Sequence, residues 1–368
     1  MRASPFDSLR SLRARNMLVG LALAALAATS LAAQAPASAP RSAGATAGQA
    51  RPSTAKPAAL RTSDGKPDLQ GTWTNATITP LERPQNVKNL VLSEEEAARM
   101  EKSVVDRRDR LNEPSDPNRT APPKGGDGST GAAGNVGGYN NFWLDPGERV
   151  AIVDGQRRSS LIIDPPDGRV PSLTPEARAR QAARGKTMMG RGQYDHPEYR
   201  PLAERCLLSF GPTTPLVPNY FYNNNLQIVQ TPDHVMILME MVHDARVVRI
   251  GGKHLPKHIR PWMGDSIGQW EGDTLVVDTT NFPPQQNFRG SSETLHVVER
   301  FRRADANTIN YRFTVDDPTT FTAPFTGEIP FRAMNELIYE YACHEGNYAL
   351  ANVLSGARNE EKRLGTKQ

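Results

Sequence analysis

The sequence predicts a mainly β protein, in which an antiparallel meander closes into an up-and-down, calycin-like barrel or forms a strongly curved sheet. The second half of the chain consists of short β-branched and aromatic runs separated by residues typical of tight turns. Within these runs polar and apolar residues alternate, which assigns one face of each strand to a core. Only two clear helices are expected, both heavily charged, so we place them on the surface.

The first 35 residues have the pattern of a secretory signal peptide. Four arginines precede an apolar stretch from Met17 to Leu31, and small residues follow it, with cleavage expected near Ala33 or Ala35. An uncleaved membrane anchor is the alternative, but the apolar stretch is short for one. We therefore expect a periplasmic or secreted protein without stable membrane insertion after cleavage.

The charge balance argues against nucleic acid as a partner. The whole chain has a formal net charge of +4, and residues 1–35 carry four Arg and one Asp, so about +1 remains after their removal. A near-neutral chain without a basic stripe is not typical of proteins that bind nucleic acids or anionic membrane surfaces.

Two segments are too poor in large apolar residues to fold by themselves. Residues 36–63 are rich in Pro, Ala and Ser and are predicted to be a disordered tether. Residues 64–368 then form a single β-rich domain, or one domain with an N-terminal subdomain. Within it, residues 114–138 are Gly-rich and predict a flexible loop, either a mobile lid or a disordered insertion.

Two helix starts can be read from the sequence. Ser93 followed by Glu96 is a capping box, which predicts a helix from there to about Leu111. Thr174 before Pro175 predicts a second helix, because proline is well tolerated at the first helical position.

The predicted strands follow one another with short turns between them, as in an antiparallel meander. A meander of seven or more strands removes its free edges by closing on itself. The expected strands are Leu226–Gln230, Val235–Met241, Arg246–Ile250, Gln269–Trp270, Thr274–Asp278, Leu295–Phe301, Ile309–Val315 and Glu336–Cys343.

Glu299 breaks the alternation of its strand. It shares a predicted core face with Leu295, Val297 and Phe301. A carboxylate on that face needs a partner, because an unpaired buried charge is driven towards its neutral form.

Four phrases of the chain resemble a large family of secreted bacterial proteins of unassigned function. The phrases begin at Gly71, Ser160, Gly268 and Tyr339 and read GTW, SLIIDPPDGR, GQWEGDTLVVD and YEYACHEGNY. The resemblance covers most of the chain after the signal peptide and implies export, but it carries no activity with it. The Gly-x-Trp pieces at Gly71 and Gly268 are also similar to the lipocalin signature, although this chain is far longer than a lipocalin.

Cys206 and Cys343 are the two cysteines of the chain. In an exported protein a lone pair most often forms a disulfide. The alternative is a nucleophilic Cys343 served by His344, but neighbouring residues of a strand point to opposite faces.

Six of the seven histidines lie between Pro232 and Asn347, where several accompany carboxylates. Imidazoles that titrate near neutral pH are suited to acid–base catalysis, although any one of these histidines also fits a turn or a solvated surface. The candidate catalytic residues are His243, Asp244, His258, Arg260, His296 and His344.

A metal site is the competing interpretation of these histidines. A divalent ion could be held by some of Glu240, His243, Asp244, His254, His258 and His344, but no His-Glu-x-x-His motif or paired cysteines are present. We therefore assign no metal ligands and predict no cofactor. Phosphate-loop, dinucleotide-binding and serine-hydrolase elbow motifs are not found either.

Aromatic and amide residues near the histidines predict a small-molecule pocket. Such residues can stack against a ring and fix its hydroxyl groups, although the amides also suit turns. The expected substrate-binding residues are Tyr222, Asn224, Glu240, Trp262 and Tyr341.

Together these observations lead to a hypothesis of cofactor-free acid–base chemistry, by a lyase or hydrolase acting on a small polyhydroxylated or aromatic molecule. In it His243 acts as the base, Asp244 orients His243, and Arg260 or His258 stabilises developing negative charge. The alternatives are a non-catalytic periplasmic binding protein for a small amphipathic ligand and a structural envelope component. The sequence does not determine the oligomeric state.

Overall fold

The computed structural model describes residues 60–111, 118, 144–189, 192, 194–208, 219–220, 222–285, 288–291, 293–346 and 348–365. The chain divides into two units, residues 1–54 and 55–368, and the first of these lies outside the described residues. The predicted signal peptide and the tether as far as residue 59 therefore also lie outside them. So does the predicted loop at 114–138, apart from Asn118.

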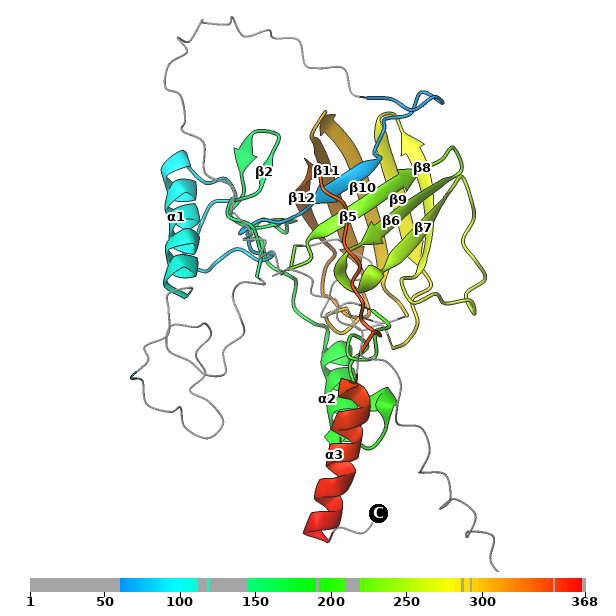
Figure 1. The fold of residues 1–368 in the computed structure, drawn as a ribbon. Helices are drawn as coiled ribbons and strands as arrows, with labels where there is room; N and C mark the ends of the chain where they lie inside the picture. The colour runs from blue at the N-terminus through cyan, green and yellow to red at the C-terminus, as the bar shows by residue number, and fades with distance from the viewer. Residues whose placement is uncertain are drawn as a thin grey trace, which may run out of the picture. The chain divides into compact units, whose positions relative to one another are not determined.

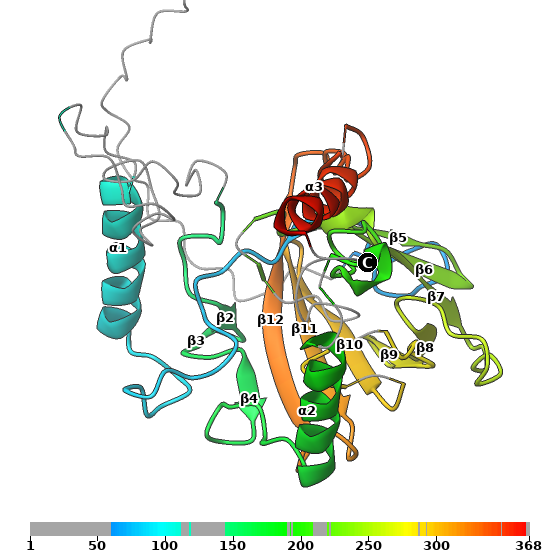
Figure 2. The same cartoon turned by 90° about the horizontal axis from the view of Figure 1, so that it is seen from below.

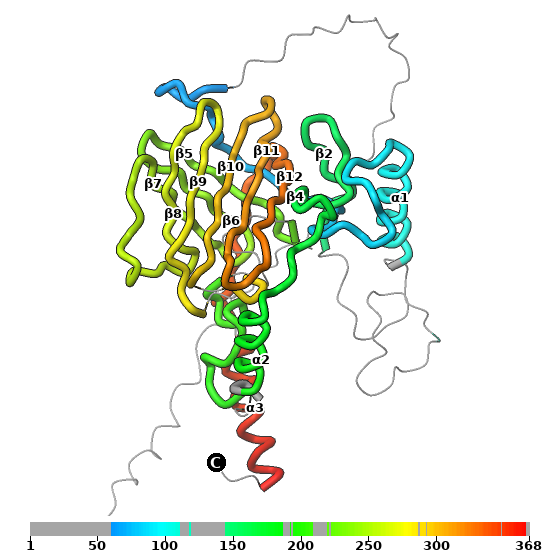
Figure 3. The backbone as a smooth tube through the Cα atoms, turned by 180° about the vertical axis from the view of Figure 1, so that it is seen from behind, coloured from blue at the N-terminus to red at the C-terminus, as the bar shows by residue number. Residues whose placement is uncertain are grey.

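Nine strands form a closed, mixed β-barrel, which confirms the predicted fold class (Figures 1 and 3). Sequence neighbours pair from β5 to β12, and β1 closes the barrel by pairing with both β5 and β12. The strands of the barrel are β1 (Gly71–Thr74), β5 (Asn225–Gln230), β6 (His234–Met239), β7 (Ala245–Ile250), β8 (Asp265–Glu271), β9 (Thr274–Thr280), β10 (His296–Asp305), β11 (Thr308–Asp316) and β12 (Phe325–Met334).

One pair of barrel strands departs from the predicted antiparallel pattern. β7 and β8 run parallel, and their register covers only Val248–Ile250 opposite Ser266–Gly268. A parallel pair needs a crossover connection, which here is the segment 251–264 on the outside of the barrel. The first half of β7 is thereby left without a paired neighbour on the β8 side.

β12 was not predicted, because Pro330 in its middle reads as a strand breaker. The Glu328 N–H donates to the Leu161 carbonyl on the side away from β11. By strand alternation the Pro330 nitrogen points to that same side. On that side β12 pairs with β4 (Ile162–Asp164) through residues 326–327 and with β1 through residues 332–334. Pro330 lies between these two pairings, so its missing N–H costs no ladder hydrogen bond with either.

The predicted strand Glu336–Cys343 is wrong. Pairing of β1 with β12 has already closed the barrel, so no edge remains beside β12 for a further strand. The segment runs over the outside with Leu337 and Tyr339 exposed. It is held instead by a disulfide and by a hydrogen bond from the Tyr341 N–H to His243 Nδ1.

Both predicted helix starts are confirmed. Ser93 and Glu96 exchange the two hydrogen bonds of a capping box at the start of α1 (Glu94–Leu111). The Thr174 hydroxyl accepts from the Ala177 N–H at the start of α2 (Pro175–Met189). A third helix, α3 (Ala349–Leu364), follows the barrel. Figure 2 shows α2 and α3 apart from one another near one end of the barrel.

The short elements are the β2–β3 hairpin (Ile152–Val153 and Gln156–Arg157) and the 3₁₀ helices η2 (Pro197–Tyr199) and η3 (Met241–His243). In the described part of the chain, no helix has both the length and the apolar character needed to cross a membrane.

Large side chains fill the barrel interior. Tyr311 stacks on Phe331 and packs against Phe301, with ring centroids 4.9 Å apart in each pair. All three rings are fully buried. Gly327 is required beside them, because a Cβ added there would lie 2.3 Å from the ring of Phe313.

Glu299 lies in this interior as the strand alternation predicts, and it has the partner that a buried carboxylate needs. Arg246 of β7 forms a two-pronged ion pair with it, with Nη2 2.8 Å from Oε1, and the Tyr311 hydroxyl donates to Oε1 at 2.8 Å. Burial opposes the charge of Arg246, but the adjacent Glu299 outweighs it, and the pKa of Arg246 is raised. The pair joins β7 to β10 across the barrel interior.

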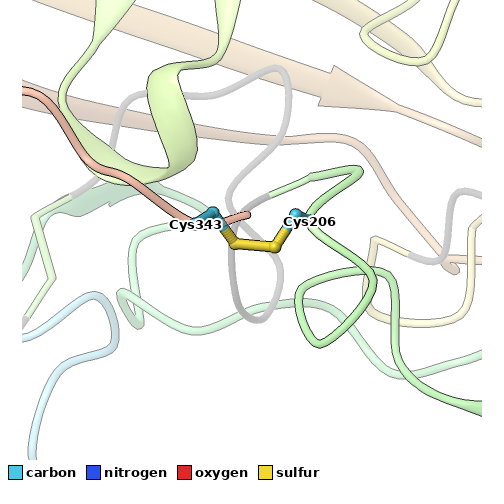
Figure 4. The surroundings of a disulfide bond; sticks show 2 residues. All are labelled: Cys206 and Cys343. Carbon is cyan, nitrogen blue, oxygen red and sulfur yellow. A yellow bond between two sulfur atoms is a disulfide. The ribbon is translucent and has the colours of Figure 1, made fainter. Parts of the chain in front are cut away.

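Cys206 and Cys343 form the predicted disulfide, across 137 residues of sequence (Figure 4). The loop it closes contains strands β5 to β12. Its two ends come from segments outside the barrel, one after η2 and the other before α3. The bond therefore fixes the C-terminal segment to the remainder of the domain.

We expect Cys206→Ser with Cys343→Ser to lower the free energy of unfolding by about 4 to 5 kcal/mol, the value for a loop of this length in the chain-entropy model. Equilibrium denaturation in urea, with the wild-type protein measured under oxidising and reducing conditions, provides the measurement. An unchanged free energy of unfolding would contradict a role in constraining the unfolded chain.

We expect Glu299→Gln to lower the free energy of unfolding by about 3 to 5 kcal/mol, because it leaves the Arg246 charge buried without an anion. The matched control is the triple variant Arg246→Met, Glu299→Leu, Tyr311→Phe, which removes every member of the group. It should recover most of the loss. A Glu299→Gln variant as stable as wild type in urea would show that the pair is not needed.

Candidate functional site

The six predicted catalytic residues do not form one group. His243 lies in the turn between β6 and β7, and His258 and Arg260 lie in the 251–264 crossover. His296 is on the outer face of β10, and His344 is exposed in the C-terminal segment. Arg260 binds the Phe282 carbonyl at 2.7 Å and so holds the crossover in place.

The β6–β7 turn, residues 240–244, is strained. Val242 and His243 have φ values of 61° and 56°, a region that side chains disfavour and that a β-branched valine strongly avoids. Glu240 and Asp244 at its ends are buried, and Glu240 Oε2 has no hydrogen-bond partner among the described residues. Backbone strain beside a buried carboxylate is typical of functional segments.

His243 does not have the geometry expected of a base oriented by Asp244. A backbone N–H can only donate, so the bond from the Tyr341 N–H makes His243 Nδ1 an acceptor at 2.8 Å. In the neutral ring the proton then resides on Nε2. His243 therefore acts as a hydrogen-bond acceptor that anchors the C-terminal segment.

The predicted substrate-binding residues also lie in different places. The Asn224 amide group donates to the carbonyls of Asp145 and Tyr220, so it holds the segment before β5. Tyr222 is half-buried and packs edge-on against Tyr220. Tyr341 lines a cavity of about 670 Å³ beside Cys343 and α3, whereas Trp262 lines a different one.

The cavity at Trp262 is the β7/β8 cleft, with a volume of about 410 Å³. It lies where the parallel pairing stops, so the first half of β7 faces the end of the crossover instead of a strand. Side chains from the inner face and from the outer face of the barrel both line the cleft. Its lining consists of His234, Ala245, Arg246, Val247, Arg249, Pro261, Trp262, Met263, Gly264, Asp265 and Ser266.

Gly264 fixes the shape of this cleft. Its φ is 75°, and a Cβ there would lie 2.7 Å from the Phe282 ring and 2.8 Å from the Thr280 carbonyl oxygen. The crossover therefore passes close to β9 just before β8 begins. Trp262, two residues earlier, keeps 37% of its surface exposed.

The charged groups of the cleft are held in pairs. Arg246 is bound by Glu299, and Arg249 Nη2 lies 2.9 Å from Asp265 Oδ1. Ser266 shares a hydrogen bond of 2.9 Å with Thr279 inside the barrel. The cleft thus presents polar groups with little unbalanced charge.

A chain of carboxylates and imidazoles continues from the cleft over the outer face of β9 and β10. His254 Nδ1 lies 3.0 Å from Asp265 Oδ2, and His254 Nε2 lies 2.9 Å from Asp278 Oδ1. The second oxygen of Asp278 lies 2.9 Å from His296 Nε2. The chain attaches the crossover to three strands.

The chain of carboxylates and imidazoles shifts the pKa of two of its members. The hydrogen bond from His296 is the largest cause of the lowered pKa of Asp278 and outweighs the opposing effect of burial, with His254 adding to it. The same bond raises the pKa of His296, again against burial. Each group therefore stabilises the charged form of the other.

Sequence reasoning missed Asp265, Asp278 and His234. Alternation along β9 and β10 puts Asp278 and His296 on the outer face, a signal that was available. Their contact depends on the register, and the contact with His254 depends on the path of the crossover, which no sequence pattern indicated. His234 lines the cleft, with Nδ1 3.1 Å from Asp233 Oδ1.

The described residues contain no group of three or more His, Cys, Asp or Glu side chains that could hold a metal ion. No protein-family model matches the chain, and no curated protein matches it. The family resemblance noted in the sequence therefore stays a prediction.

The Asp278–His296 pair should give the protein a pH-dependent stability. The lowered pKa of Asp278 means that its contribution is complete above about pH 4 and is lost as the pH falls. The raised pKa of His296 means that its contribution is complete below about pH 6.5 and is lost as the pH rises. We expect the pair to stabilise the folded protein most between about pH 4 and about pH 6.5.

Thermal melts of wild type and His296→Gln across this pH range test the expectation, with His344→Gln as the control for an exposed histidine. The difference in melting temperature between wild type and His296→Gln should be largest inside the window and shrink on both sides of it. A difference independent of pH would contradict it.

Proposed function

We propose that this protein binds a small neutral molecule that has a flat apolar face and hydroxyl groups, and that the β7/β8 cleft holds it. The observation that supports this most directly is the exposed indole of Trp262 beside walls whose charges are paired. Aromatic rings stack on flat apolar faces, and a cleft of about 410 Å³ is within the usual range for small ligands.

The paired charges favour a neutral ligand. Glu299 compensates Arg246, and Asp265 compensates Arg249. A charged ligand would lose its hydration in the cleft without gaining a free counter-ion, which is unfavourable. Hydroxyl groups lose less hydration free energy on burial, and they can form hydrogen bonds with the polar edges of the cleft.

The backbone of β7 supplies such edges. The Asp244 carbonyl and the Ile250 N–H both bond towards β6. Strand alternation therefore directs the backbone groups of Ala245 and the Val247 N–H towards the β8 side, ahead of the parallel ladder that begins at Val248 and Ser266. These groups face the cleft as a short, directional set of donors and acceptors for a hydroxylated ligand.

A second candidate is acid–base catalysis by a lyase or hydrolase on the same class of molecule. It is favoured by His234, whose Nδ1 lies beside Asp233 and which lines the cleft. A carboxylate on one ring nitrogen orients an imidazole for proton transfer through the other. In this version His234 takes the role that the sequence assigned to His243.

We also propose that the protein is exported to the periplasm or secreted. The Cys206–Cys343 disulfide supports this location, because such bonds persist in oxidising compartments. The predicted signal peptide is the sequence feature behind the proposal.

Trp262→Ala should weaken ligand binding at least tenfold, or by about 1.4 kcal/mol, because it removes the stacking surface. Calorimetric titration with neutral mono- and disaccharides and with phenolic glycosides measures this. Tyr339→Ala, which removes an exposed aromatic ring outside the cleft, should bind as wild type does. Equal binding by Trp262→Ala and wild type would place the ligand elsewhere, and no binding of any probe would contradict the ligand class.

His234→Asn separates binding from catalysis. A binding protein should keep its affinity within a few fold, and incubation should leave the bound probe unchanged in both wild type and variant. An enzyme should convert the probe, as followed by mass spectrometry, and His234→Asn should lose most of that conversion while still binding. Conversion that is equal in both proteins would remove His234 from the chemistry.

A further inference from the structure

A third cavity, of about 360 Å³, lies between the β2–β3 hairpin and the outer side of β10 to β12. Arg149 and Arg332 both line it, from segments far apart in the sequence. It shares no lining residue with the β7/β8 cleft. Nothing in the proposed function uses it.

Both arginines are held against the same short segment, residues 76–78. Arg332 of β12 donates from Nη2 to the Ala76 carbonyl at 2.9 Å. The Arg149 carbonyl accepts from the Ile78 N–H at 3.0 Å and from the Thr77 hydroxyl at 2.8 Å. The first contact holds the Arg332 guanidinium itself, and the other two fix the backbone position from which the Arg149 side chain extends.

The guanidinium groups have unused donors. Among the described residues, the bond to Ala76 is the one hydrogen bond made by the Arg332 guanidinium, and that of Arg149 makes none. A guanidinium carries five N–H donors in a planar fork that fits the two oxygens of a carboxylate or phosphate. Both residues line the cavity, and most of their donor capacity has no acceptor among the described residues.

Like charges also oppose each other here. Partial burial, and after it the charge of Arg149, lower the pKa of Arg332, and Asp145 offsets them only in part. Two cations brought together in a partly desolvated place destabilise each other unless an anion lies between them.

Two carboxylates also line the cavity, but they leave positive charge in excess. Asp154 is already bound by Arg302 at 2.7 Å and by the Asn310 amide at 3.0 Å. Asp305 accepts from the Asn307 N–H at 2.8 Å and is the one remaining acid of the lining. Within the lining, Arg149 and Arg332 exceed it by one positive charge, and Asp145, which acts on Arg332, lies outside the lining.

We propose that the cavity is a binding site for an oxyanion, the phosphate or carboxylate group of a small ligand, held between Arg149 and Arg332. Charge-assisted hydrogen bonds from both forks would replace the donors' contacts with water and remove the repulsion between the two cations. The site is separate from the β7/β8 cleft, so either proposal can fail without the other.

Titration calorimetry of the protein with inorganic phosphate, and separately with acetate, tests the proposal. Saturable binding of at least one of them is expected, and it should weaken with added sodium chloride. Comparison of the two probes shows which oxyanion the site prefers. Absence of saturable binding by both would overturn the proposal.

Arg149→Gln should weaken binding at least tenfold, because one of the two forks is lost. Arg149 is exposed, so this variant should keep the fold, which its melting temperature checks. Arg332→Lys keeps the charge but removes the fork and should also weaken binding. Arg178→Gln, on the exposed surface of α2, is the matched control and should bind as wild type does. Binding by Arg149→Gln and Arg332→Lys equal to wild type would overturn the assignment.

Discussion

The buried ion pair between Arg246 and Glu299 is the interaction on which the candidate site depends. A lone charge in the barrel interior would be strongly destabilising, so neither partner is tolerated without the other. The pair fixes β7 relative to β10 and β11 at the position where β7 separates from β8. A polar interaction inside an aromatic core therefore holds one wall of a cleft that opens to the outside.

The parallel step from β7 to β8 explains the other features of this region. Because β8 runs in the same direction as β7, the chain must return through a crossover, and an irregular crossover needs partners for its backbone and polar groups. Asp265 supplies them by accepting from the Leu255 N–H, Arg249 and His254. The carboxylate–imidazole chain is thus first a structural device that attaches the crossover to the barrel. Asp265 is buried, whereas His254, Asp278 and His296 are partly exposed at the surface of the barrel.

Features that depend on local sequence patterns were predicted, whereas features that depend on how the barrel closes were missed. Alternation around Glu299 was sufficient to show that a buried carboxylate needed a partner, but not that Arg246 was that partner. Pro330 hid β12, because its tolerance depends on lying between two neighbouring strands. Glu336–Cys343 has the alternation of a strand and was placed as one, but the barrel was already closed. The predicted catalytic histidines all lie in the second half of the sequence, between His243 and His344, but strand direction and the crossover distribute them over the surface.

The β7/β8 cleft and the cavity at Arg149 and Arg332 differ in how the charges of their arginines are compensated. This difference determines which class of ligand each can bind. In the β7/β8 cleft the protein supplies the anions itself, so the guanidinium groups are rigid and their charge is neutralised. A ligand there gains from shape, stacking and hydroxyl contacts. At Arg149 and Arg332 the protein leaves the cations largely without acceptors, so an anionic ligand completes the arrangement. If one molecule occupied both kinds of site, its neutral and anionic ends would have to span separate faces of the barrel; two independent ligands satisfy the same charges without that constraint.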